Sequence, residues 1–191
     1  MKRLIQFTIF ALLIAAFIYL GSKDYREKIK NNNKSTTSND VLIDGDTLFV
    51  KANHSKILSK LSSDSTFILY TCTNSNKLCP KYGLLINEIA KNYNIEDLYY
   101  YDIESDRENN NGTYQKIVSK LKPYLLTDDN NEQDLHAPSV YFIKNGKVYS
   151  FDDSLAFNRG KQSLDNLWND KVKEEKREYL ISVMEGYILN E

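Results

Sequence analysis

Two cysteines, Cys72 and Cys79, are the residues of this chain best suited to chemistry. They are the two cysteines in 191 residues, and six residues separate them. Such a pair can form one structural disulfide, act as a displaced redox pair, or remain as two buried thiols that behave as small hydrophobic side chains. One disulfide cannot hold together a chain of this size, so a core must stabilise the fold. A hydrophobic share of 41% is enough to build one.

Hydrophobic patterns place both cysteines between a strand and a helix. Residues 66–71 form a largely apolar run, typical of a strand buried on both faces. Residues 84–93 carry apolar side chains at helical spacing. The loop between these elements could bring the two Cβ atoms to the roughly 3.5–4.5 Å that a disulfide needs.

The rest of the chain alternates strands with helices. Such an order indicates a partly parallel central sheet with helices on both faces. Tyr99, Tyr100, Tyr101 and Tyr141 are expected to pack within this sheet. The predicted elements are a hairpin of 41–43 with 48–50, a helix at 54–61, a strand at 98–103, a helix at 113–126 broken or ended at Pro123, a strand at 139–143, a tight Asn145-Gly146 turn into a strand at 147–151, and a long helix or helix pair at 162–189.

Three segments of this pattern resemble thioredoxins. They are Phe67–Cys72 leading to Cys79 and the segment Leu84–Ala90, which is similar to the Leu-x-Glu-Ile-Ala pattern of thioredoxins; Tyr99–Asp102; and Ala137–Gly146 with its Pro138 and Lys-Asn-Gly turn. The resemblance implies an α/β thioredoxin-like fold, a central mixed sheet flanked by helices, over residues 41–191 with a C-terminal helical extension. It also implies a cis Ala137–Pro138 bond beside the cysteine loop. Tyr70–Tyr82 is similar to small Gram-positive thioredoxin-like proteins that include bacteriocin-transport accessory proteins.

The resemblance also shows a departure at Asn76. If Cys79 matches the second active-site cysteine of thioredoxins, the first falls on Asn76, and the motif reads Asn76-Lys77-Leu78-Cys79. Asparagine cannot form a mixed disulfide, but its side chain is a good helix N-cap. Pro80 leaves two helix registers open: with Asn76 as N-cap the proline forfeits a helix bond, and with Cys79 as N-cap it takes the favoured first position.

His136 offers an alternative use of the cysteines. Copper-delivering members of the thioredoxin fold bind Cu(I) with two cysteines and a histidine from a comparable loop, and Cys72, Cys79 and His136 could imitate that set. The expected role of His136 is a solvent-facing loop residue, and His54 is expected at the surface near a helix start. No cofactor is expected.

The N-terminus predicts a membrane anchor. Residues 4–20 are uncharged, follow Lys2 and Arg3, and lead to no small-x-small cleavage site. We therefore expect a single-pass membrane anchor or uncleaved signal over 1–22, in preference to a cleaved signal, and a flexible polar tether over 23–40. The flanking charges do not fix the orientation, and the resemblance favours an extracytoplasmic domain at the cell membrane.

Three functions fit these residues. The first is a thiol-disulfide oxidoreductase or redox-related accessory factor using Cys72 and Cys79. The second is a redox-silent binding module that holds an extended peptide or protein segment beside Ala137, Pro138 and Asn76, assisting peptide export or secretion. The third is the Cu(I)-binding protein. The net charge of -1 argues against a nucleic-acid partner.

Overall fold

The computed structural model describes residues 47–127, 133–157 and 163–189. The predicted anchor and tether, and the first arm of the predicted hairpin at 41–43, lie outside these ranges. Within them, no helix has both the length and the apolar character needed to cross a membrane.

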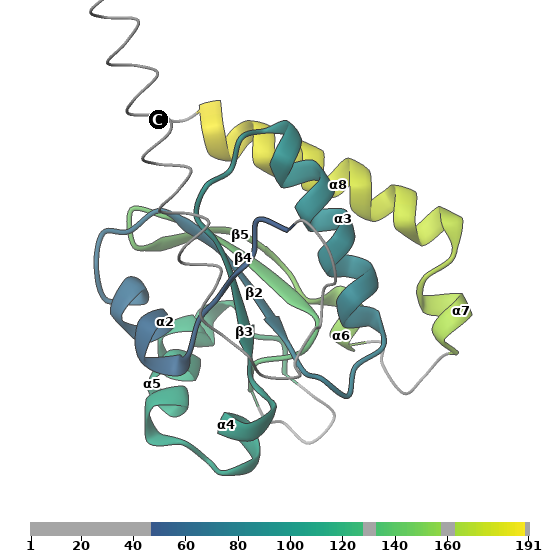
Figure 1. Ribbon diagram of the computed structural model, residues 1–191. Helices are drawn as coiled ribbons and strands as arrows, with labels where there is room; N and C mark the ends of the chain where they lie inside the picture. The colour runs from purple at the N-terminus through teal and green to yellow at the C-terminus, as the bar shows by residue number, and fades with distance from the viewer. Residues whose placement is uncertain (1–46, 128–132, 158–162, 190–191) are drawn as a thin grey trace, which may run out of the picture. The chain divides into compact units, whose positions relative to one another are not determined.

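One mixed sheet forms the centre of the described domain (Figure 1). Its strand order is β1-β3-β2-β4-β5, in which β1, β3 and β2 are parallel and β4 is antiparallel to both β2 and β5. The carboxyl ends of the three parallel strands therefore meet at one edge of the sheet, where β4 begins. The strands are β1 (Val50–Lys51), β2 (Phe67–Cys72), β3 (Leu98–Asp102), β4 (Ser139–Lys144) and β5 (Lys147–Asp152).

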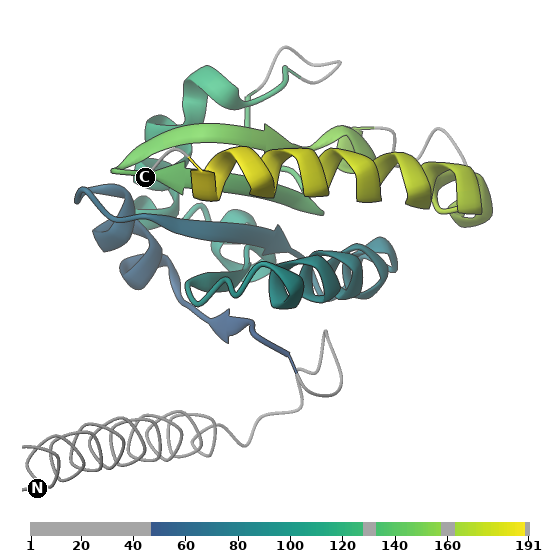
Figure 2. The ribbon, with the colours of Figure 1, turned by 90° about the horizontal axis from the view of Figure 1, so that it is seen from above.

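Helices cover both faces of this sheet, with α2 and α5 on one face and α3 and α8 on the other (Figures 1 and 2). Each face has its own hydrophobic core. The first core contains Ile57, Leu69, Tyr114 and Tyr141, and the second contains Ile68, Tyr70, Ile86, Phe142 and Met184. The helices are α2 (His54–Leu61), α3 (Leu78–Asn92), α4 (Glu104–Glu108), α5 (Gly112–Leu121), the 3-10 helix η1 (Lys122–Tyr124), α6 (Ser154–Phe157), α7 (Leu164–Leu167) and α8 (Asp170–Leu189).

Local sequence explains several element boundaries. All six residues of β2 are buried, as expected for a central strand covered on both faces. Helix α2 begins after Asn53, whose side-chain oxygen accepts the Lys56 N–H at 2.9 Å. Asn145 and Gly146 have φ values of 50° and 71°, so this pair forms the predicted tight turn between β4 and β5. A Cβ on Gly146 would also collide with the backbone oxygen of Ser63.

Other boundaries differ from the predictions. Val50 and Lys51 pair in parallel with β3, so this segment is an edge strand of the main sheet. Helix α3 begins at Leu78, six residues before the predicted start, and α4 and α6 were not predicted. The C-terminal segment is a helix pair, and the helix before Pro123 ends at Leu121 and continues as η1.

The Ala137–Pro138 peptide bond is cis, which confirms the prediction. The four tyrosines predicted to pack within the sheet, Tyr99, Tyr100, Tyr101 and Tyr141, are all buried. The mixed sheet, its β2-α3-β3 crossover, its terminal hairpin and the cis-proline before β4 together match the predicted thioredoxin-like fold.

Candidate redox site

The two cysteines form a disulfide. Cys72 is the last residue of β2 and Cys79 is the second residue of α3, and their Cα atoms lie 5.9 Å apart. Both residues are 0% exposed. The alternative of two unpaired thiols is therefore wrong for this structure. Closing so short a loop contributes about 2–3 kcal/mol to stability by the chain-entropy relation.

The start of α3 matches neither predicted register. The helix begins at Leu78, so Cys79 lies inside it and is not its N-cap. The Asn76 side-chain oxygen nevertheless accepts the Leu78 N–H at 3.0 Å, and the Asn76 carbonyl accepts the Cys79 N–H at 3.0 Å. Pro80 is the third helical residue, where an N–H would have no partner within the helix. The helix therefore tolerates Pro80 while Asn76 satisfies its first donors.

Asn76 also binds the cis-proline loop. Its side-chain nitrogen donates a 2.6 Å hydrogen bond to the Ala137 carbonyl, and the residue is only 4% exposed. Thr71 Oγ1 and Ser139 Oγ each donate to the His136 carbonyl at 3.0 Å, which holds the other side of the same loop. Asn76 is therefore an internal connector between the cysteine loop and the cis-proline loop.

His136 does not complete a copper site in this structure. The sulfurs of Cys72 and Cys79 are bonded to each other and cannot act as thiolate ligands. Across the described ranges, no three His, Cys, Asp or Glu side chains are grouped to hold a metal ion. With the disulfide closed, the structure therefore does not group Cys72, Cys79 and His136 as a metal site within the described residues. His136 is half-buried, and its Nε2 lies 3.4 Å from the Leu126 carbonyl.

Tyr70 lies directly against the disulfide. Its hydroxyl donates to the Cys79 carbonyl at 2.7 Å, and the same oxygen is 3.5 Å from Cys72 Sγ. Burial raises the pKa of Tyr70 well above its ordinary value. The sequence contains a signal for this contact, because alternate residues of a strand share a face and Tyr70 is two residues before Cys72. Tyr70 was nevertheless not among the predicted site residues.

A buried ion pair fixes α8 beside this site. Asp152, at the end of β5, accepts hydrogen bonds from Lys176 Nζ at 2.8 and 2.6 Å and from the Tyr82 hydroxyl at 2.6 Å. Ser154 Oγ donates to Asp152 at 2.7 Å and also contacts Lys176 Nζ. Burial alone would raise the pKa of Asp152, but the Lys176 charge and these donors together lower it.

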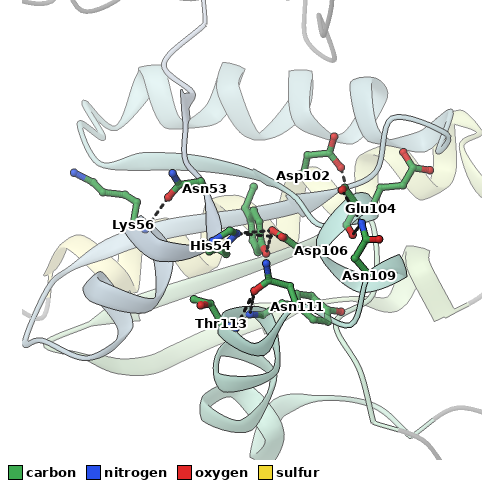
Figure 3. Close-up of polar contacts among 12 residues, drawn as sticks. Asn53, His54, Lys56, Asp102, Glu104, Asp106, Asn109, Asn111 and Thr113 are labelled. Carbon is green, nitrogen blue, oxygen red and sulfur yellow. Dashed lines mark hydrogen bonds and ion pairs between the residues drawn. The ribbon is translucent and has the colours of Figure 1, made fainter.

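A second polar cluster lies at the same edge of the sheet (Figure 3). His54 Nδ1 points at Asp106, 3.1 and 3.0 Å from its two carboxylate oxygens, and the Tyr101 hydroxyl donates to Asp106 Oδ2 at 2.7 Å. Asp102, which is paired with Cys72 across the sheet, accepts the Glu104 N–H at 3.0 Å. These contacts connect α2 and α4. His54 lies at the start of α2, as predicted, but its side chain is half-buried in this contact.

No protein-family model matches the chain, and neither does any curated protein. Solved structures similar to it include two oxidized thioredoxins from Arabidopsis thaliana. Thioredoxin O1 has 17% identity and a TM-score of 0.38, over 55% of this chain and 83% of that one. Thioredoxin O2 has 18% identity and a TM-score of 0.40, over 64% of this chain and 96% of that one. In this chain's own structure, a cysteine pair at disulfide distance within a thioredoxin-like fold supports a redox-type function.

Proposed function

We propose that this protein is a membrane-anchored, extracytoplasmic thioredoxin-like accessory factor in which Cys72 and Cys79 form a slow redox couple. The observation that carries the proposal is the disulfide itself, which joins the end of β2 to the start of α3 next to the cis-proline loop. Its assistance to peptide export or secretion is part of the proposal, supported by the resemblance to bacteriocin-transport accessory proteins.

Burial makes this couple slow. Disulfide exchange requires a thiolate to reach one sulfur, and both cysteines are 0% exposed. Asn76 stands where an exposed attacking cysteine would be expected, and it is itself bound to the cis-proline loop. Exchange therefore requires local opening of the first turn of α3. Such a protein would exchange electrons with a dedicated partner and would be a poor general reductase.

The rate and reversibility of disulfide opening test this function. The full-length chain in detergent is treated with dithiothreitol, and free thiols are counted by alkylation and mass spectrometry. We expect opening to be at least about tenfold slower than in the same chain unfolded by guanidinium, because the folded form must first open locally. We also expect oxidised glutathione to restore the disulfide while circular dichroism shows a folded chain.

A redox-silent binding module is the second candidate. It is favoured by Asn76, which replaces the attacking thiol and uses its side chain to hold Ala137 beside Pro138. In this candidate an extended peptide or protein segment docks at that loop, and the disulfide is purely structural. A disulfide that opens only when the chain unfolds would support this candidate and contradict the redox couple.

The proposed location rests on residues 4–20 and on the disulfide. The uncharged run is long enough for an anchor, and disulfides persist mainly outside the cytoplasm. We expect protease added to intact cells or protoplasts to degrade the domain at 41–191, detected by an antibody to that domain. A domain that is degraded only after lysis would contradict the extracytoplasmic placement. A cytoplasmic protein should remain intact until lysis and serves as the control.

A further inference from the structure

We propose that the Tyr70 hydroxyl stabilises the Cys72 sulfur when the disulfide opens, an assignment that rests on the redox couple proposed above. Tyr70 is fully buried, and its hydroxyl oxygen is 3.5 Å from Cys72 Sγ. The same hydroxyl donates to the Cys79 carbonyl at 2.7 Å. Tyr70 therefore contacts both halves of the couple.

The hydroxyl has one hydrogen and two neighbouring acceptors. While the disulfide is closed, the sulfurs are weak acceptors, and the hydrogen goes to the Cys79 carbonyl. A Cys72 thiolate would be a much stronger acceptor, and a Cys72 thiol could instead donate to the Tyr70 oxygen. Burial raises the pKa of Tyr70, so the hydroxyl keeps its hydrogen at neutral pH. In either protonation state, the reduced Cys72 sulfur gains a hydrogen bond that the disulfide lacks.

During reduction, the electron pair of the broken S–S bond ends on the cysteine sulfur next to Tyr70. Cys79 lies between buried Leu78 and half-buried Pro80, at a helix start that also carries the exposed Lys77 and Lys81, whereas Cys72 lies between buried Thr71 and Thr73 at the end of a buried strand. A thiolate of a dithiol reductant therefore attacks Cys79 Sγ when the first turn of α3 opens.

The new bond joins the reductant sulfur to Cys79 Sγ, the Cys72–Cys79 bond breaks, and its electron pair moves to Cys72 Sγ. That thiolate accepts the Tyr70 hydrogen bond. The second thiolate of the reductant then attacks its own mixed disulfide, which releases Cys79 and oxidises the reductant. The two protons from the reductant's thiols end on the two cysteines.

The Tyr70→Phe variant tests this assignment, with Tyr82→Phe as its matched control. Tyr82 is also buried, and its ring centroid is 6.1 Å from that of Tyr70, but its hydroxyl binds Asp152. Full-length chains in detergent are equilibrated with reduced and oxidised dithiothreitol, and the dithiol fraction is measured by alkylation.

At equilibrium the dithiol form keeps a neutral hydrogen bond between the Cys72 thiol and the Tyr70 hydroxyl, so we expect Tyr70→Phe to lower the equilibrium constant for reduction by roughly 2- to 10-fold. Tyr82→Phe should match the native chain, because its hydroxyl does not contact either cysteine. Equal constants for Tyr70→Phe and the native chain would overturn the assignment.

A second measurement keeps Tyr70 in place and does not depend on opening the disulfide. In the full-length Cys79→Ser chain, Cys72 is a free thiol, and its ionisation is followed by the pH dependence of alkylation. We expect the ¹³Cζ resonance of Tyr70 to shift as Cys72 ionises, while that of Tyr82 does not follow it. A Tyr70 resonance that ignores Cys72 would overturn the assignment. A native disulfide that opens only on unfolding would instead contradict the proposed function alone.

Discussion

A chain that carries both Asn76→Cys and Cys72→Ser is expected to reduce insulin disulfides, whereas the native chain should show little or no such activity. The double substitution recreates a Cys-Lys-Leu-Cys motif and leaves Cys79 free to resolve a mixed disulfide. Cys72 must be removed because in the native chain it is already bonded to Cys79. The new thiol would stand before the first turn of α3, where helix N–H groups favour a thiolate.

The expected gain over the native chain is about tenfold or more. Lowering a thiol pKa from about 8.5 to about 7 raises its thiolate fraction at neutral pH roughly tenfold, and the native chain presents no exposed thiol at this position. Turbidity of reduced insulin, with a dithiol as electron source, measures the rate. The matched control is Asn76→Ser with Cys72→Ser, which makes the same structural changes without the new thiol.

The double substitution also removes stabilising contacts, so a thermal melt must show that the chain is folded. It loses the disulfide and the 2.6 Å hydrogen bond from Asn76 to the Ala137 carbonyl. A folded variant without activity would mean that Cys79 does not correspond to the second thioredoxin cysteine. A native chain that reduces insulin rapidly, and loses this ability with Cys72→Ser alone, would contradict the slow couple proposed here.

Local patterns were sufficient to predict much of the fold. The apolar run that became β2, the helical spacing of α2 and the Asn145-Gly146 turn each depend on neighbours in sequence, and each lies within a residue or two of its predicted place. The start of α3 did not follow from local pattern. Pro80 is acceptable in more than one helix register, and the side chain of Asn76 selects the observed start through contacts on both sides.

The residues missed at the site depend on contacts across the fold. Tyr70 meets the disulfide because Cys79 folds back over β2, and Asp152 meets Lys176 across 24 positions of the chain. No spacing in the sequence distinguishes Lys176 from the other lysines of this charged helix. Only the packing of α8 against β5 shows that this lysine is turned inward.

Lys176→Met is expected to destabilise the folded chain by about 3–5 kcal/mol, the usual cost of breaking a buried ion pair on one side. The Asp152 side chain is 9% exposed and the Lys176 side chain 14%, so water cannot replace the missing cation. Guanidinium unfolding followed by circular dichroism measures the loss. The exposed Lys171, which lies 3.8 Å from Glu175, provides the matched control: Lys171→Met should change stability by at most about 1 kcal/mol.

The pH dependence separates loss of the ion pair from loss of packing. In the native chain the pKa of Asp152 is lowered from its ordinary 3.8, so its contribution is complete above that value and is lost as pH falls through the lower folded pKa. In Lys176→Met the cation is gone and burial acts largely unopposed, which should raise the Asp152 pKa above its ordinary value. The variant should therefore regain part of its lost stability as pH falls from neutral towards 5, where the native chain gains nothing from Asp152.

Adding Asp152→Asn to Lys176→Met should recover stability at neutral pH and remove this pH dependence. If Lys176→Met alone costs less than about 1 kcal/mol, or if its deficit is the same at both pH values, Asp152 is not a buried carboxylate that depends on Lys176.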